Sequence, residues 1–434
     1  MTHKARGGRL VGTEALARVE GEGAMYVEID GDEVRDVRLD IYEPPRFYEG
    51  FLRGRAWSEP PDITARICGI CPVAYQMSAC AAIEDAFGVD AGDPIRRLRR
   101  LLYAGEWIES HTLHIHFLHA PDFFGVDSGI ELAAIDRPAV ERALELKKLG
   151  NRIVERIGGR AIHPVNIRVG GFHRLPTRRE IAETREDMAR ATDLAEAVVD
   201  WVSRFDFPDF ETTHELVAVQ DPAGYPVLGD RIVSDRGLDI AVGDFDDHVV
   251  ETHVPHSTAL HAHLVERGEY LVGPLARYSL ASAALAPRAA AAARAAGLGT
   301  RCRNPFRSIV VRAVETLHAC EIALDVVEDY IEPPAAHAVV EPRAGVGHGV
   351  TEAPRGLLYH RYAFDAEGTI TDVSIVPPTS QNQAAIEHDL WHFVEDNLDL
   401  GDDELRRSAE VTIRNHDPCI SCATHFLDLT VVRS

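Results

Sequence analysis

The stretch "ARICGICPVAYQ", residues 65–76, contains a Cys-x-x-Cys pair formed by Cys68 and Cys71. A second pair, Cys419 and Cys422, lies in "NHDPCISCATHF", residues 415–426. Two sulfurs on one tight loop can turn toward a single ion, and cysteine thiolates bind zinc, nickel, iron and iron–sulfur clusters. Because nearly the whole chain separates the two pairs, we expect the fold to enclose one buried centre with four thiols.

Two simpler interpretations of these thiols stay open from the residues alone. A structural four-cysteine zinc site is favoured when the pairs lie about 15–20 residues apart, and a thioredoxin-like dithiol needs only one pair. The other three cysteines, Cys80, Cys302 and Cys320, are scattered along the chain. We expect them to be buried as small hydrophobic side chains.

The composition excludes several classes of partner. The 434 residues carry a formal charge of -24 and are 45% hydrophobic, which is typical of a protein with a large core. An acidic chain repels phosphate groups and anionic lipids, so we expect neither nucleic acid nor a membrane surface as a partner. The first residues contain no apolar signal segment, and no apolar run approaches the ~18 residues of a spanning helix. These features predict a cytoplasmic protein.

The spacing of apolar residues predicts a single, predominantly helical α+β domain. Residues 25–41 alternate apolar and polar side chains around an Asp-Gly turn, and residues 362–376 show a similar pattern, so each segment predicts an antiparallel hairpin. The spacing is helical from about residue 75 to 205 and again from about 306 to 332. We expect a central bundle of long helices that encloses the metal site, with the hairpins at its periphery.

The stretch "HVVETHVPHSTALHAHL", residues 248–264, is rich in histidine. Residues 256–263 are interpreted as a helix, on which His256 and His263 would share one face. We expect these histidines to be ordinary core or surface residues rather than ligands of a transition metal.

The two cysteine stretches, "RICGIC" and "DPCISCATH", resemble the paired signatures of the large, catalytic subunit of nickel-iron hydrogenases. The resemblance continues, in the order of that family, through "ARVEGEG" (17–23), "PRFYEGFLRGR" (45–55), "ESHTLHIHFLHAPDF" (109–123), "HPVNIRVGGF" (163–172), "YLVGPLAR" (270–277), "EAPRG" (352–356) and "VPPT" (376–379). It therefore spans the chain. The short length and the "CPVAYQ" segment look most like the cytoplasmic, bidirectional branch that is linked to NAD(P).

The resemblance implies a nickel ion bound by Cys68, Cys71, Cys419 and Cys422. Cys71 and Cys422 would also bridge to an iron ion that carries carbon monoxide and cyanide ligands. Arg355 of "EAPRG" falls where the family places a guanidinium over the open metal position. Taken alone, this arginine would be interpreted as a structural partner of a buried carboxylate.

Three carboxyl groups are also implied to serve the site. Asp122 and Asp417 match family carboxylates around the arginine and could orient it through charge-assisted hydrogen bonds. Asp417, which precedes a proline, could equally be a turn residue. Glu20 matches the first proton acceptor beyond Cys419, although by sequence alone it would be a glutamate on a surface strand.

A second metal site is implied near the C-terminus. Glu49, His425 and a backbone carbonyl near Ser374 match the ligands of a magnesium or iron ion. In the family a maturation endopeptidase cuts directly after this histidine once nickel is bound. The resemblance thus implies a hydrogenase domain over residues 1–425 and a removable extension over residues 426–434.

The implied activity is the reversible cleavage of H2 into protons and electrons. Too few cysteines remain for a four-thiolate iron–sulfur cluster, so the electrons must leave through an iron–sulfur small subunit. Diaphorase-type subunits that bind flavin and NAD(P) are expected beyond it. Three alternatives remain: a hydrogen-sensing regulatory subunit with the same metal centre, a related quinone-reductase subunit, which would lack the four cysteines, and a structural zinc protein.

Overall fold

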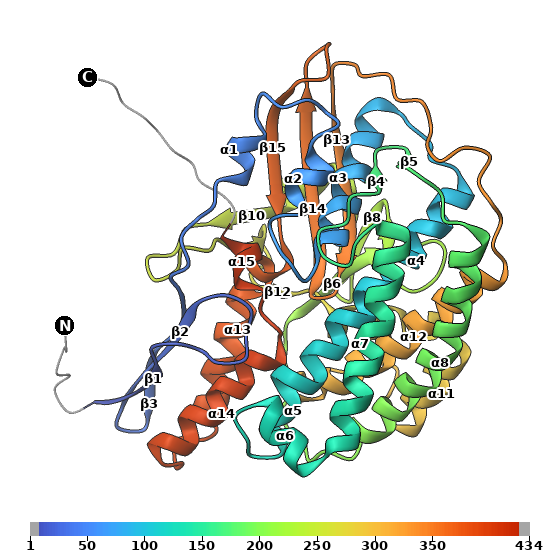
Figure 1. The fold of residues 1–434 in the computed structure, drawn as a ribbon. Coiled ribbons are helices and arrows are strands. Elements are labelled where there is room, and N and C mark those ends of the chain that lie inside the picture. Colours follow the sequence, from blue (N-terminus) through green and yellow to red (C-terminus); the bar gives the residue numbers. More distant parts are fainter. Residues whose placement is uncertain (1–7, 425–434) are drawn as a thin grey trace, which may run out of the picture.

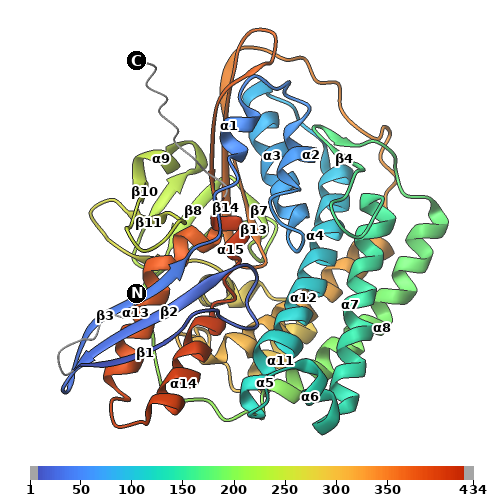
Figure 2. The ribbon, with the colours of Figure 1, turned by 60° about the vertical axis from the view of Figure 1, so that its left-hand side comes forward.

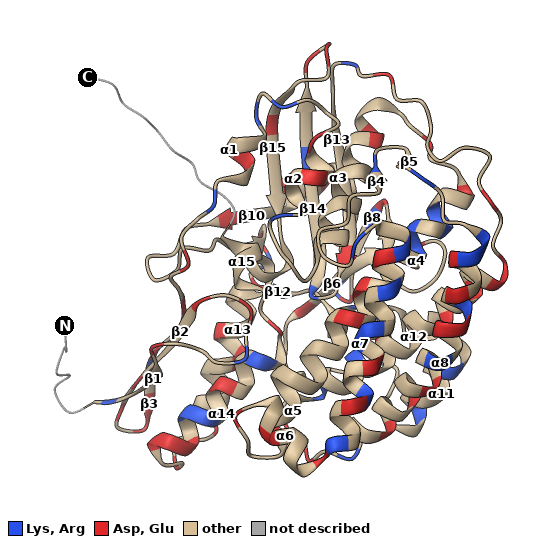
Figure 3. Cartoon of the chain, viewed as in Figure 1, with Lys and Arg blue, Asp and Glu red and all other residues tan. Residues whose placement is uncertain are grey.

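Long helices form the body of the molecule in the computed structural model, which describes residues 8–424. They are α3 (Pro72–Phe87), α4 (Asp93–Leu113), α7 (Arg137–Gly158), α8 (Arg178–Val202) and α12 (Ser308–Glu328). α4 packs along α7, and α12 packs against both α4 and α8 (Figure 1). Because α3 and α12 are apolar around most of their circumference, they are buried, whereas α7 and α8 show charged bands on their outer faces (Figure 3). The predicted helical body is confirmed.

A four-stranded antiparallel sheet covers α3. Its strands lie in the order β15-β14-β13-β7 and comprise β15 (Ile370–Val376), β14 (Gly356–Phe364), β13 (Gly345–Ala353) and β7 (Leu228–Gly229). The strands β14 and β15 are the predicted second hairpin. A Cβ atom on Gly349 would lie 2.4 Å from the Ala82 backbone nitrogen of α3. The absence of a side chain at this position therefore lets the strand lie directly on the helix that follows the first cysteine pair.

The N-terminal sheet lies beside the C-terminal helices. It contains β1 (Arg9–Thr13), β2 (Gly23–Asp30) and β3 (Glu33–Ile41), and the turn at Gly31 has a φ of 63°. The strand β3 packs on α13 (Pro378–Glu395), and β1 contacts α14 (Asp402–Asn415), as Figure 2 shows. The predicted first hairpin is confirmed, and this sheet packs against the C-terminal helices α13 and α14.

The histidine-rich stretch is a hairpin and not a helix. The strands β10 (Val249–Thr252) and β11 (His261–Leu264) pair in antiparallel fashion, so the expected helix over residues 256–263 is wrong. Pro255 removes a backbone donor, and Val249, Val250 and Thr252 are β-branched, which favours strands over a helix. A further mixed sheet has the order β12-β6-β8-β9, with β12 (Tyr270–Leu271), β6 (Glu215–Gln220), β8 (Arg231–Ser234) and β9 (Asp239–Ala241).

Short elements complete the fold. They are α1 (Tyr48–Leu52), α2 (Pro60–Thr64), the π-helical turn η1 (His114–His119), α5 (Ala120–Phe123), α6 (Gly129–Ile135), β4 (Ile167–Arg168), β5 (Gly171–Phe172), η2 (Val242–Asp244), α9 (Phe245–His248), α10 (Pro274–Ala281), η3 (Ser282–Ala284), α11 (Pro287–Ala295), η4 (Pro305–Arg307) and α15 (Ile420–Ala423). Within residues 8–424, no helix combines the length and the apolar character that crossing a membrane requires. The expected α+β class, with mostly helical content, is confirmed.

Candidate metal centre

The first cysteine pair lies in the loop between α2 and α3. Cys71 is the N-cap residue of α3, and the Cys68 Sγ atom accepts a hydrogen bond from the Ile70 backbone N–H at 3.3 Å. The carboxylate of Glu106, on α4, accepts hydrogen bonds from the backbone N–H groups of Val73 and Ala74 at 2.6 and 3.1 Å. A carboxylate at a helix N-terminus satisfies the free N–H groups there, so Glu106 fixes the end of the helix from which the pair projects.

The second pair lies at α15, with Cys419 as the N-cap residue and Cys422 inside the helix, and it is held by the N-terminal segment. The Cys419 backbone N–H donates to Thr379 Oγ1 at 2.9 Å, and the Ile420 N–H donates to the Glu20 carbonyl at 3.0 Å. Asp417 has a φ of 53°, a left-handed conformation that turns the chain out of α14. Residues from opposite ends of the sequence thus form one wall of the site.

All four sulfur atoms meet in one buried cluster. The Sγ–Sγ distances are 3.4 Å between Cys68 and Cys419, 3.6 Å between Cys71 and Cys422, and 2.7 Å between Cys419 and Cys422. Two thiolates at 2.3 Å from one tetrahedral ion lie about 3.8 Å apart, so the cluster fits a metal after small side-chain shifts. Burial raises the pKa of the Cys419 and Cys422 thiols, which makes a cation necessary if they are to be thiolates.

Arg355 lies beside these sulfurs and is fully buried. Its Nε and Nη2 groups donate to the backbone carbonyl and the carboxylate of Asp417, each at 3.0 Å. The guanidinium is therefore fixed by the residue two positions before Cys419. Arg277 holds the turn that carries Arg355, because its guanidinium donates to the Ala353 and Pro354 carbonyls at 2.9 and 3.0 Å.

Asp122 lies elsewhere in the network than we expected. Its carboxylate accepts hydrogen bonds from Arg414 at 2.9 Å and from Arg18 at 2.5 Å, and within residues 8–424 it makes no hydrogen bond to Arg355. Burial alone would raise its pKa, but the two arginines outweigh burial and lower it. Asp122 thus ties α14 to the N-terminal segment, and Asp417 is the carboxylate that orients Arg355.

Glu20 contacts the second cysteine pair directly. Its Oε2 atom lies 3.2 Å from Cys419 Sγ and accepts a hydrogen bond from the Ser421 N–H at 3.1 Å. Burial, followed by the charge of Cys68, raises the pKa of this carboxyl group. A carboxyl group in this position can take a proton from the sulfur.

Glu49 lies at the edge of β15. Its Oε1 atom accepts a hydrogen bond from the Ile375 N–H at 2.7 Å, which places it beside the peptide group that contains the Ser374 carbonyl. Burial raises the pKa of Glu49 to about 7. Burial also raises the pKa of Glu251 to about 8, an effect to which the charge of Glu49 adds. Two buried carboxyl groups whose charges affect each other are a setting that a divalent cation would stabilise. The other expected side-chain ligand, His425, lies outside the described residues.

Three of these residues, Glu106, Arg277 and Glu251, could not be assigned to the site from the sequence. Glu106 and Arg277 act on backbone groups that are distant in sequence, and no local pattern identifies such contacts. Glu251 lies in the histidine-rich stretch of residues 248–264, where only the histidines were considered as ligands. An acidic or basic residue inside an apolar segment was the one signal that could have identified Glu106 and Arg277 as buried and paired.

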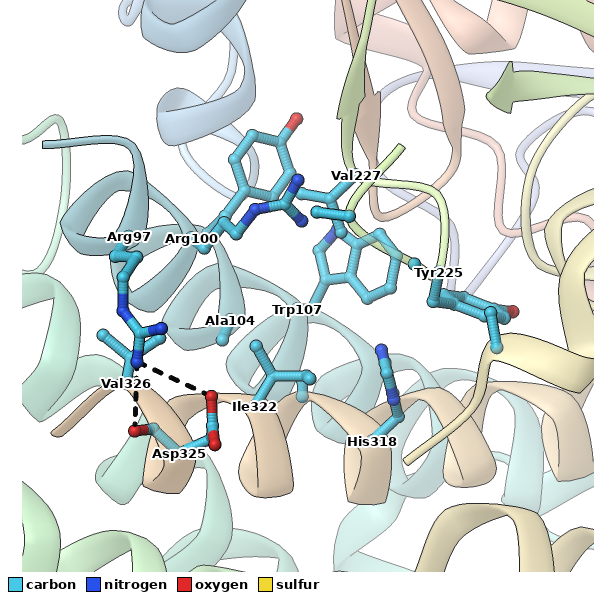
Figure 4. Close-up of a pocket in the computed structure, with 15 residues that line it drawn as sticks. Arg97, Arg100, Ala104, Trp107, Tyr225, Val227, His318, Ile322, Asp325 and Val326 are labelled. Atoms are coloured by element: carbon cyan, nitrogen blue, oxygen red, sulfur yellow. Dashed lines mark hydrogen bonds and ion pairs between the residues drawn. The ribbon is translucent and has the colours of Figure 1, made fainter. Parts of the chain in front are cut away.

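A separate cavity of about 230 Å³ lies between α4 and α12. Figure 4 shows the Trp107 and His318 side chains at its wall and the ion pair of Arg97 with Asp325 at one end. The Trp107 ring stacks over Arg277, whose Cζ atom is 4.4 Å from the ring centroid. Because no cysteine lines this cavity, it is distinct from the four-thiol cluster.

Thiolates in a dry pocket stabilise soft metals, so the cluster is suited to hold a thiolate-bound metal centre. Residues 46–139 match the family model described as nickel-dependent hydrogenase. The sulfhydrogenase 1 subunit alpha of Pyrococcus furiosus is 33% identical over 420 residues, which cover 95% of this chain and 97% of that protein. The chain therefore belongs to the nickel-dependent hydrogenase family and is an oxidoreductase of that type. The resemblance seen in its sequence is confirmed.

Two further comparisons extend this assignment. The NAD-reducing hydrogenase HoxS subunit beta of Cupriavidus necator is 29% identical, over 95% of this chain and 94% of that protein. The crystal structure of an NAD+-reducing NiFe-hydrogenase in the H2-reduced state superposes with a TM-score of 0.87, at 28% identity, over 96% of this chain and 99% of that chain. The whole described fold is thus that of a hydrogenase subunit of this kind.

Proposed function

We propose that the four thiolates hold a nickel–iron pair that cleaves H2 reversibly into protons and electrons. Cys68 and Cys419 would be terminal ligands of nickel, whereas Cys71 and Cys422 would bridge to an iron that carries carbon monoxide and cyanide. The observation that carries this proposal is the buried convergence of four sulfurs from both ends of the chain. Membership of the nickel-dependent hydrogenase family supports the choice of metal.

The residues around the thiols are proposed to position charge and to transfer protons. When bound, the metal pair supplies the Lewis acid that polarises H2 and accepts its electrons. Arg355, fixed by Asp417, keeps a positive charge and N–H donors beside the sulfurs. Glu20 receives a proton from Cys419 Sγ across 3.2 Å and passes it outward. Asp122 acts indirectly, because its arginine partners hold the segments that position Glu20 and the second cysteine pair.

The electrons are proposed to leave through an iron–sulfur small subunit. Cys80, Cys302 and Cys320 are buried and, among the described residues, do not gather into a second group of metal ligands. Diaphorase-type subunits that bind flavin and pass electrons to NAD(P) complete the proposal, together with a cytoplasmic location. The NAD-reducing relative and the NAD+-reducing structural neighbour support this electron acceptor.

A magnesium or iron ion is proposed to bind Glu49, His425 and the Ser374 carbonyl. The buried carboxyl groups of Glu49 and Glu251 support a cation at this position. A maturation endopeptidase would cut after His425 and leave residues 1–425 as the active domain. The cut would remove residues 426–434, which also lie outside the described part of the chain.

Replacement of Cys419 by Ser tests the proposal, with Cys80→Ser as a matched control at a buried cysteine outside the cluster. We expect the first change to abolish dye-linked H2 oxidation and to lower the nickel content, and the control to retain both. Unchanged turnover in Cys419→Ser would refute the assignment. Nickel without any turnover in the wild-type complex would instead favour a hydrogen-sensing subunit.

A further inference from the structure

A second group of metal-type ligands lies outside the four-thiol cluster. His214 directly precedes β6, His388 and Asp389 lie on α13, and His416 is the C-cap residue of α14. The His214 Nε2 atom is 3.0 Å from Asp389 Oδ1, and His416 Nε2 is 3.1 Å from Asp389 Oδ2. One ring nitrogen each of His214 and His388 and an oxygen of Asp389 all lie within 4.8 Å of one another.

The polar atoms of this group are buried and incompletely satisfied. The side chains of His214 and Asp389 are 1% exposed, and that of His416 is 3% exposed. Among the described residues, His388 Nδ1, Asp389 Oδ2 and His416 Nε2 make no hydrogen bond. His416 and Asp389 approach each other closely, but without the alignment of a hydrogen bond. Buried donors and acceptors without partners are costly, and a cation between them would remove that cost.

An outer chain of hydrogen-bonding groups orients His388. Its Nε2 atom lies 3.0 Å from His392 Nε2, and His392 Nδ1 lies 3.1 Å from Glu395 Oε2. A histidine that ligates a metal through one ring nitrogen usually hydrogen-bonds through the other, which fixes its tautomer. The Nε2 atom of His388 is engaged in this way. Its buried Nδ1 atom is the one that can bind a metal ion.

The protonation states suit metal binding. Burial lowers the pKa of His388, so its ring is neutral at neutral pH and offers a lone pair. Burial alone would raise the pKa of Asp389, but the hydrogen bond from His214 and the nearby His416 hold it well below its usual range. The group therefore presents three imidazoles and one carboxylate, which is a ligand set typical of zinc.

We propose that His214, His388, Asp389 and His416 bind one divalent ion of the zinc class. Ligand atoms at about 2.0–2.2 Å from one tetrahedral ion lie about 3.3–3.6 Å apart. The ligand atoms of His214, His388 and Asp389 lie within 4.8 Å of one another, so the side chains must close by up to about 1.5 Å. The ion would join the start of β6, α13 and the end of α14. Because His416 is three residues before Cys419, the ion would also fix the segment that presents the second cysteine pair.

A neighbouring group, His256, His261 and Glu387, contains one residue of α13, Glu387, and provides the matched control. Glu387 Oε1 already accepts hydrogen bonds from His256 Nε2 at 2.7 Å and from the Leu39 N–H at 2.9 Å. His256→Gln thus removes a partly buried histidine with a carboxylate partner on the same helix, but leaves the proposed ligands intact. The proposal shares no ligand with the nickel–iron assignment and can fail independently of it.

The test measures zinc binding to the natively purified complex after treatment with a chelator. Zn²⁺ is added in competition with a chromophoric chelator, and bound zinc and nickel are counted by mass spectrometry after gel filtration. We expect one zinc per chain, in addition to nickel, and an affinity at least tenfold lower in His388→Gln and Asp389→Asn. His256→Gln should bind zinc like the wild type.

Thermal melts provide a readout that does not depend on activity. A ligand that binds only the folded state raises the melting temperature, so added Zn²⁺ should raise that of the wild type and of His256→Gln but not of His388→Gln. If Asp389→Asn does not fold, the His388 variant still allows the test, because the side chain of His388 is 32% exposed and its replacement disturbs the core less. Absence of zinc from the wild type, or equal losses in His388→Gln and His256→Gln, would overturn the proposal.

Discussion

Replacing Glu20 by Gln isolates the first step of proton transfer. The Oε2 atom of Glu20 lies 3.2 Å from Cys419 Sγ and accepts a hydrogen bond from the Ser421 N–H at 3.1 Å. A glutamine has the same length, and its amide oxygen can still accept from Ser421. The local fold and the cysteine position should therefore be preserved. The amide cannot take up a proton, so only the chemical step is removed.

The size of the expected effect follows from the role of a positioned acid–base group. Such groups contribute about 10²–10⁴ in rate, or about 2.7–5.4 kcal/mol of barrier. We expect H2 turnover to fall by this factor in Glu20→Gln, with the nickel content unchanged. Glu20→Asp withdraws the carboxylate by about 1.5 Å, one C–C bond, and should show an intermediate loss.

The assay is dye-linked H2 oxidation, with nickel counted in the same sample. Glu22→Gln is the matched control, because Glu22 is an exposed carboxyl group on the same segment and should leave turnover unchanged. If Glu20→Gln retains turnover within about twofold of the wild type at equal nickel content, protons leave Cys419 by another route and the reasoning is wrong.

Three further changes test other parts of the structure. Arg355→Lys replaces a fixed planar guanidinium by a flexible ammonium. Dye-linked turnover should therefore fall by at least tenfold while nickel stays bound. Full activity would contradict the role of this arginine. Gly349→Ala brings a Cβ atom to 2.4 Å from the backbone of α3 and should lower the free energy of unfolding by about 1–3 kcal/mol. Gly345→Ala is the control, because its Cβ atom would lie 3.4 Å from the Ala86 carbonyl oxygen and should cost little. Equal melting temperatures of the two variants would contradict this packing. Arg174 lowers the pKa of Glu180 to about 2, so the contribution of this carboxylate is present above about pH 4.3 and is lost as the pH falls toward 2. Glu180→Gln should thus destabilise the chain by up to about 1 kcal/mol at pH 6 and by less at pH 3, and an equal difference at both pH values in denaturant unfolding would contradict it.

Local patterns predicted the regular elements well. The Asp30-Gly31 turn and the alternation around it specify the first hairpin, and the long apolar spacing of residues 75–205 specifies the helices. The two cysteine pairs were sufficient to predict one shared centre. These features depend on neighbours in sequence or on residue types with a narrow chemistry, and the structure agrees with each of them.

Long-range pairing could not be predicted in the same way. Asp122 pairs with Arg414 and Arg18, which lie 292 and 104 positions away in the sequence, and only the folded path of the chain brings the three side chains together. His214 meets Asp389 across 175 positions, and nothing in either segment indicates the other. The helix expected over residues 256–263 failed because strand pairing outweighed the local spacing of histidines.

The central claim is that four cysteines from both ends of the chain bind nickel. The most direct test is to count nickel and iron per chain by mass spectrometry in the complex purified natively with its partners. The account predicts about one nickel together with iron in the wild type, and loss of nickel in Cys419→Ser. A wild-type complex that turns over H2 without nickel, or that holds only zinc, would contradict the account.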